Sequence, residues 1–161
     1  MINKEKIRQL ITEKLEGTVI VLVDLQVSPS NQIKVLLDSF EGVTISKCVE
    51  ISRLVEGSLD REEEDFELEV SSYGLLQPFM LPLQYLKNIG RKVEVFYKEG
   101  KSIKGILNKV KLTENKEAVE SVEILIKKKI KQEGKKKKIE VEEITSITDE
   151  EIQKVKLVPT F

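Results

Sequence analysis

The chain of 161 residues contains no histidine and no tryptophan, and its only cysteine is Cys48. Without histidine it lacks the side chain that most often acts as a general base near neutral pH, and it lacks any Ser-His or Cys-His nucleophile system. A single cysteine cannot form an intramolecular disulfide, which favours a cytoplasmic location. Aromatic residues make up only 5% of the chain, so extended base-stacking surfaces are not expected. These absences favour a binding protein over an enzyme, with no catalytic residues, cofactor, metal site or small-molecule substrate.

Long apolar runs are also missing. No stretch approaches the roughly 20 apolar residues that a bilayer-spanning helix needs. The N-terminal residues 1–6 are charged and lack the apolar segment of a signal peptide. We therefore expect a cytoplasmic protein with no membrane partner.

Charge is unevenly distributed along the chain. Residues 1–90 hold 9 Lys/Arg and 15 Asp/Glu, a balance of −6, whereas residues 91–161 hold 18 and 13, a balance of +5. Opposite signs indicate two surfaces with different partners. The alternative interpretation is two solvated domains between which the charges happen to divide.

Hydrophobic periodicity in the first half predicts an α-β-β-α-β order. A helix is expected over 3–16, a hairpin over 19–27 and 33–37, a second helix after Thr44, and a strand over 66–70. The expected buried stripe of the second helix consists of Ile45, Cys48, Ile51, Ser52, Val55 and Leu59. This α+β order is that of a KH-like half domain, but the GXXG loop with which KH domains grip RNA is absent. KH-type RNA binding is therefore not expected here.

The second half reads as a short helix followed by five strands. Pro78 and Pro82 indicate a linker, and the helix ends before Gly90. A change of phase beside Gly105 indicates a bend or bulge of the kind that closes small barrels. The pattern predicts a C-terminal Sm-like or SH3-like small β-barrel, with domains at 1–82 and 83–161.

Three segments are candidate contact surfaces. The acidic candidates for a basic protein partner are Glu62, Glu63, Glu64, Asp65, Glu67 and Glu69. The acidic run lacks the pattern of a calcium loop, so a solvated loop is favoured over a metal site. The loop Ser71, Ser72, Tyr73, Gly74 follows the third strand; without a histidine base, a turn is favoured over a serine nucleophile.

The third segment, residues 127–138, contains eight lysines among twelve residues. Gln132, Glu133 and Gly134 predict a turn, so the run is expected at the tip of a hairpin. Dense lysines neutralise phosphates without sequence preference. The alternative is edge protection against strand aggregation. The candidates for RNA contact are Lys127, Lys129, Lys131, Lys135, Lys136, Lys137 and Lys138.

Residues 66–75, Phe-Glu-Leu-Glu-Val-Ser-Ser-Tyr-Gly-Leu, resemble the LEVSSPG signature of the bacterial ribosome maturation factor RimP family. Segments at 35–38, 42–45, 48–53, 89–93, 104–107 and 152–157 resemble other parts of that family in the same order. Tyr73 stands where the signature has proline, and Leu76-Gln77-Pro78 stands where the family commonly has Asp-Arg-Pro.

The resemblance implies an α/β N-terminal domain, an Sm-like C-terminal barrel and a non-enzymatic role in assembly of the small ribosomal subunit. It implies transient contact with 16S rRNA and a basic ribosomal protein, and we expect a monomer. One alternative is an Sm-like regulator of messenger or small RNA, which would form rings. Another, less favoured, is a metal-dependent nuclease that uses the acidic loop.

Overall fold

A computed structural model describes residues 2–131, 133–134 and 136–159, and it has the α+β class expected from the sequence. Contacts divide the chain between Gly74 and Leu75 into two compact units. Phe79 packs in the core of the second unit, so the segment between the two prolines belongs to that unit. The boundary of independently folding domains at 82–83 stays a prediction.

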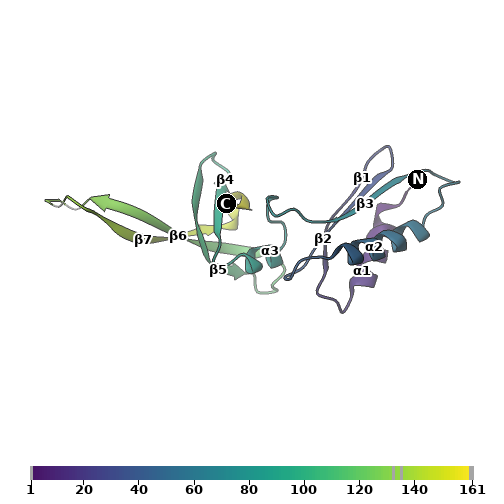
Figure 1. Cartoon of the computed structure of the whole chain (residues 1–161), viewed down its shortest axis with the longest axis horizontal. Helices are drawn as coiled ribbons and strands as arrows, with labels where there is room; N and C mark the ends of the chain where they lie inside the picture. The colour runs from purple at the N-terminus through teal and green to yellow at the C-terminus, as the bar shows by residue number, and fades with distance from the viewer. Residues whose placement is uncertain (1, 132, 135, 160–161) are drawn as a thin grey trace. The chain divides into compact units, whose positions relative to one another are not determined.

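The first unit is a three-stranded sheet with two helices (Figure 1). Its elements are α1 (Lys4–Leu15), β1 (Val21–Val27), β2 (Gln32–Asp38), α2 (Ile45–Gly57) and β3 (Glu67–Ser72). The side chains of Asn3 and Thr44 cap the two helices by accepting hydrogen bonds from the amides of Lys6 and Lys47. In the order β1-β2-β3, β2 pairs antiparallel with β1 and parallel with β3.

Both helices bury one face against this sheet. Ile11 of α1 and Ile51 and Val55 of α2 are fully buried against Leu25, Val35 and Leu37 of the strands. Of the stripe predicted to be buried, only Ile51 and Val55 are fully buried. Ile45 is 85% exposed, and Cys48, Ser52 and Leu59 are half-buried. Val19 lies before β1 and is exposed, so the strand is shorter than its run of valines predicts.

The second unit is a five-stranded antiparallel sheet with one short helix. Its elements are α3 (Pro82–Lys87), β4 (Lys92–Tyr97), β5 (Ser102–Leu112), β6 (Val119–Lys131), β7 (Lys138–Thr148), the 3₁₀ turn η1 (Asp149–Glu151) and β8 (Ile152–Leu157). The strand order is β7-β6-β5-β4-β8. All five predicted strands are therefore present.

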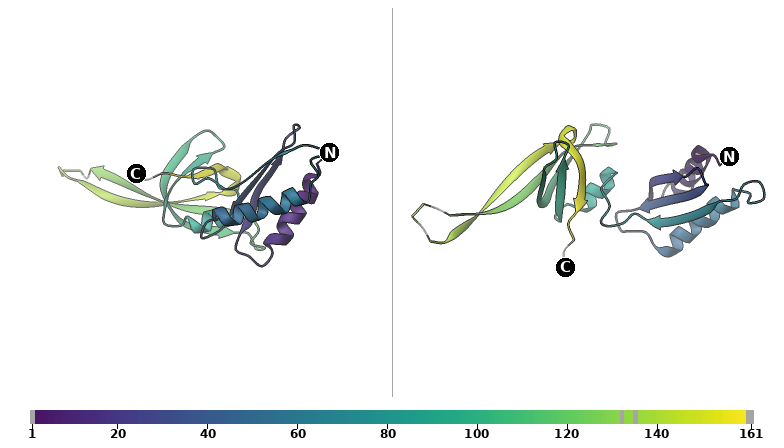
Figure 2. Two further views of the ribbon diagram at one scale, coloured as in Figure 1. Left: turned by 45° about the vertical axis from the view of Figure 1, so that its right-hand side comes forward. Right: turned by 90° about the horizontal axis from the view of Figure 1, so that it is seen from above.

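The expected closed barrel is not found in the described residues, because no ladder joins the two edge strands β7 and β8. The sheet is nevertheless strongly curved (Figure 2). Only η1 separates Thr148 at the end of β7 from Ile152 at the start of β8. That connection spans at most about 14 Å, whereas four strand spacings in a flat sheet total about 19 Å. The sheet must therefore curve so that the end of β7 lies close to the start of β8, although no ladder joins these two strands.

Helix α3 is buried through residues that the apolar pattern did not single out. Leu83 and Leu86 are only partly buried and Ile89 is exposed, while Gln84 and Tyr85 are buried. The Oε1 atom of Gln84 accepts hydrogen bonds from the amides of Met80 (2.7 Å) and Leu81 (3.0 Å). This amide side chain therefore satisfies the backbone at the start of the helix and can be buried at low cost.

Gly105 marks the point at which β5 changes partners. Residues 102–106 pair with β4, and residues 106–112 pair with β6. A Cβ atom at Gly105 would lie 2.5 Å from Cγ2 of Ile124 and 2.6 Å from the carbonyl oxygen of Leu125. The nearest register shift of the β5–β6 ladder lies further along, between Leu107 and Lys109. Gly105 thus permits the close approach of β6, and the bulge follows it.

Candidate functional site

The lysine-rich segment forms a two-stranded ribbon that extends from the five-stranded sheet (Figure 2). Strand β5 pairs with β6 only as far as Leu125, whereas the β6–β7 ladder continues to the Lys131–Lys138 pair. The last six residues of β6 therefore extend about 20 Å beyond the end of the β5–β6 ladder. We call residues 126–143 the ribbon; it contains eight lysines and four glutamates.

Lysines gather on one face of the ribbon. Directly paired residues share a face, and the pairs Lys127–Glu142, Lys129–Glu140 and Lys131–Lys138 therefore lie together. Every described lysine of the ribbon is exposed. This lysine face consists of Lys127, Lys129, Lys131 and Lys138. The structure brings together four of the seven predicted RNA-contact residues on one surface.

The remaining candidates differ in their placement. Lys136 and Lys137 are exposed between the two strands, and Lys135 lies outside the described residues. The ammonium of Lys127 lies 3.8 Å from Glu140, and that of Lys128 lies 2.9 Å from Glu143. The ribbon therefore has a net positive charge that neighbouring glutamates partly offset, a feature visible only once the strands are paired.

The opposite face of the ribbon is largely apolar. The pair Ile130–Ile139 lies next to the Lys128–Val141 pair on this face. Ile130 is 49% exposed and Ile139 is 38% exposed. Sequence reasoning missed this face, although the isoleucine within the lysine run is its signal.

The acidic segment 62–69 runs from the loop before β3 into that strand, and two of its carboxylates take part in interactions within the fold. Arg61 donates to Glu56 (2.8 Å) and Asp65 (3.1 Å), and its guanidinium lies 4.1 Å from the ring centre of Phe66. The side chain of Asn31 donates to Glu64. Glu62, Glu63, Glu67 and Glu69 are exposed. The segment therefore keeps four outward-facing carboxylates beside two that hold the loop in place.

The signature loop is anchored to the first sheet by its tyrosine. The amide of Tyr73 donates to the carbonyl of Leu37 at 2.7 Å. A proline at this position, as in the family signature, could not donate this hydrogen bond. Partial burial, with the negative charges of Asp24 and Asp38, raises the pKa of the Tyr73 hydroxyl. Gly74 and Ser72 are exposed and Ser71 is half-buried, so the loop presents small groups to the solvent.

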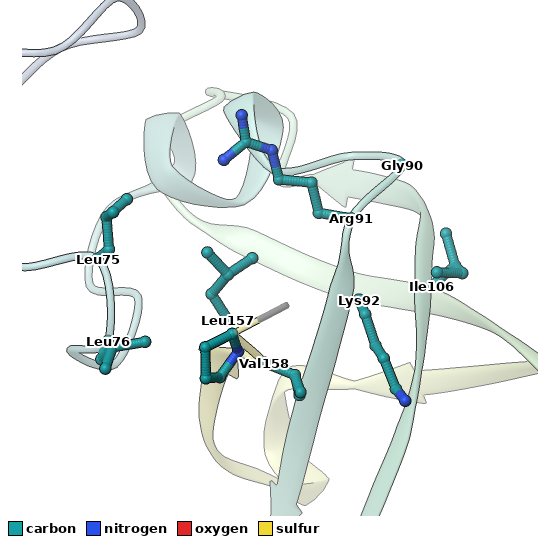
Figure 3. Close-up of a pocket in the computed structure, with 9 residues that line it drawn as sticks. Leu75, Leu76, Gly90, Arg91, Lys92, Ile106, Leu157 and Val158 are labelled. Carbon is teal, nitrogen blue, oxygen red and sulfur yellow. The ribbon is translucent and has the colours of Figure 1, made fainter. Parts of the chain in front are cut away.

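A pocket of about 610 Å³ lies on the second unit (Figure 3). Leu75 and Leu76 form one side, and Leu157 and Val158 come from the end of β8. Two charged residues, Arg91 and Lys92, also line the pocket, and their side chains point in different directions. No carboxylate, hydroxyl or thiol is among the described side chains that line it, so the pocket supplies apolar contact and positive charge rather than acid-base chemistry.

The carboxylates, the single thiol and the helices of the fold bear on metal binding, thiol chemistry and membrane spanning. In the part of the chain that the structure describes, no three Cys, Asp or Glu side chains gather where they could hold a metal ion. Burial raises the pKa of the Cys48 thiol, which keeps it in its less reactive protonated form. None of the described helices has both the length and the hydropathy to cross a membrane.

The chain thus consists of two units: the first has an excess of acidic residues, and the second contains the lysine-rich ribbon. A comparison with protein families matches residues 10–76 to the RimP N-terminal domain. The ribosome maturation factor RimP of Porphyromonas gingivalis is 34% identical over 159 residues, which cover 98% of this chain and all of that protein.

The RimP of Christiangramia forsetii is 47% identical over 94 residues, 57% of this chain and 61% of that protein. The RimP of Flavobacterium psychrophilum is 44% identical over 96 residues, 59% of this chain and 62% of that protein. The aligned stretch thus spans about three fifths of these two relatives. The chain belongs to the ribosome maturation factor RimP family.

Proposed function

We propose that this protein is a non-enzymatic, cytoplasmic ribosome maturation factor that assists assembly of the small ribosomal subunit. The observation that carries the proposal is the 34% identity to a ribosome maturation factor over nearly the full length of both chains. The absence of histidine agrees with a role in binding rather than in catalysis. We further propose that the first unit has a KH-like fold and that the curved sheet has an Sm-like fold.

The proposed partners are 16S rRNA and a basic protein of the small subunit. The charge distribution supports a different partner for each unit. Residues 1–74 hold 8 basic and 15 acidic side chains, whereas residues 75–161 hold 19 basic and 13 acidic side chains. The lysine face of the ribbon would attract RNA phosphates, and the exposed glutamates near β3 would attract the protein. Transient binding would favour a productive conformation of the immature subunit by shifting its populations.

A deletion strain tests the function. Cells that lack the protein should accumulate free small-subunit particles with unprocessed 16S rRNA, while large subunits mature normally, and the wild-type chain should restore the ratio of subunits to ribosomes. Sucrose-gradient sedimentation measures this ratio. An unchanged ratio at low and high growth temperature would refute the proposal.

A charge variant tests the RNA surface. Replacing Lys129, Lys131 and Lys138 with glutamine removes three exposed charges from the lysine face. The slope of log affinity for small-subunit particles against log salt should become shallower by about 0.7–0.9 for each lysine that contacts a phosphate. The matched control replaces Lys98, Lys104 and Lys116, which are exposed elsewhere on the second unit. An unchanged slope in the ribbon variant would show that the ribbon lysines serve only as edge protection, and equal reductions in both triple variants would show that the ribbon is not a specific RNA surface.

A further inference from the structure

A groove of about 480 Å³ lies between α2 and β3 in the first unit. One wall is a face of α2 formed by Ile45, Cys48, Val49 and Ser52, which recur at helical spacing. The other wall includes Leu68 and Val70 of β3. Helix α2 therefore has a second apolar stripe beside the one that enters the core.

This second stripe is open to solvent. Ile51 and Val55 are fully buried in the core, whereas Ile45 is 85% exposed and Val49 is 41% exposed. Cys48, Leu68 and Val70 are half-buried. Single exposed apolar residues need no explanation, whereas several that line one groove form a candidate binding surface.

Strand β3 is an edge of the sheet, and its outer backbone groups are available. The amides of Glu67 and Tyr73 donate to Asn31 and Leu37 on the β2 side. Because strand groups alternate with a period of two, the N–H and C=O groups of Leu68, Val70 and Ser72 point away from β2. No hydrogen bond to another described residue occupies these outward groups.

The other edge of the same sheet is protected. The outward amide of Leu25 in β1 donates to the side chain of Asp24 at 2.9 Å. A register shift between Leu22 and Asp24 further distorts that strand. Bulges are a common way to prevent strand addition. An outward amide that already donates to a side chain is also less available to a new strand. Among the described strands of this sheet, β1 has both devices and β3 has neither, which singles out β3 as the edge that can accept a strand.

Charge identifies the occupant. Glu67 and Glu69 are exposed on the face of β3 that points away from the helices. A strand added beside β3 would place alternate side chains next to these glutamates and the others next to the groove. Lysine or arginine suits the first set and aliphatic residues suit the second.

We propose that β3 accepts an extended, basic segment of a protein partner as a fourth strand. The backbone of Leu68, Val70 and Ser72 would form the ladder, and the groove would hold the aliphatic side chains of the segment. The identity of the partner as a ribosomal protein rests on the proposed function, but the site itself rests on the groove, the open edge and the charge.

A synthetic peptide of roughly six residues, about the length of a strand, tests the site on the full-length protein. Lysine and valine alternate in the peptide, which carries a fluorescein label for anisotropy. Two control peptides have the same composition: one has the order scrambled, and the other has N-methyl groups on the amides that would donate to β3. The alternating peptide should bind, and both controls should bind at least about tenfold more weakly, a difference of about 1.4 kcal/mol.

Matched protein variants locate the binding. Val49→Arg places a positive charge in the groove, and Val19→Arg places the same charge at a residue that is 69% exposed and outside the groove. Val49→Arg should weaken peptide binding by about tenfold or more, while Val19→Arg has a much smaller effect. Ile45→Arg replaces Val49→Arg if circular dichroism shows that the latter is unfolded. Glu67→Gln with Glu69→Gln should weaken binding and reduce its salt dependence.

Three results would overturn the proposal: equal binding of the N-methylated peptide, equal effects of Val49→Arg and Val19→Arg, or dimerisation of the chain through β3 in analytical ultracentrifugation. A protein that binds immature small subunits but not the alternating peptide would refute strand addition and leave the proposed function intact. A protein that binds the peptide but shows no effect on subunit maturation would refute the proposed function instead.

Discussion

Replacing Gly105 with alanine should destabilise the second unit through a single added methyl group. The new Cβ atom would lie 2.5 Å from Cγ2 of Ile124 and 2.6 Å from the carbonyl oxygen of Leu125. Ile124 is fully buried, so its side chain has no free space into which to turn. The carbonyl belongs to the backbone of β6, next to the Ile106–Leu125 pair, and can move only if the two strands separate.

The magnitude follows from these two contacts. Overpacking a well-packed core costs about 1–3 kcal/mol, and two close contacts, one of them with backbone, place this substitution at about 2–3 kcal/mol. For a unit of this size, the melting temperature should fall by about 8–24 °C. Differential scanning calorimetry of the full chain measures the change.

Gly57→Ala is the matched control. Gly57 is the last residue of α2, and a Cβ atom there would meet nothing within 4 Å. The control should be neutral or raise the stability of the first unit by up to about 1 kcal/mol, because alanine favours helix more than glycine does. If Gly105→Ala changes the stability by less than about 0.5 kcal/mol, a range typical of ordinary surface substitutions, the close approach of β5 and β6 is wrong.

Three further predictions concern the tyrosines and the division of the chain. Tyr73→Pro removes the hydrogen bond to Leu37 and should cost about 0.5–1.5 kcal/mol in urea denaturation; a loss above about 3 kcal/mol would show a backbone conformation that proline cannot adopt. Burial, with a contribution from Asp149, raises the pKa of Tyr85 to about 12. The hydroxyl of Tyr85 therefore ionises at lower pH in the unfolded chain than in the folded one. Its contribution should lower the free energy of unfolding between about pH 10 and 12, by at most about 1.4 kcal/mol per pH unit, and the fall should be smaller in Tyr85→Phe. Limited proteolysis should cleave within residues 74–83 and release a C-terminal fragment that unfolds cooperatively; a fragment without a cooperative transition would contradict independent folding.

Local sequence patterns were sufficient to predict the order and type of the elements. The alternation in β4 and the helical spacing in α1 arise from backbone geometry within a few residues, and the patterns are strong in both segments. The cap at Thr44 and the turn at Gly17, where φ is +76°, depend on local chemistry as well. The signature around Ser71 and Ser72 is likewise a local feature, and it indicates the family from the order of residues alone.

Which apolar or charged side chains are available for binding could not be predicted in the same way. Ile45 and Ile51 both suit an amphipathic helix, but the position of β3 leaves Ile45 in an open groove and Ile51 in the core. The lysines of β6 look unopposed in the sequence, yet β7 brings Glu140 close to Lys127. Burial and pairing depend on segments that are distant in the chain and meet only on folding, so the tertiary structure alone decides which surfaces remain open to a partner.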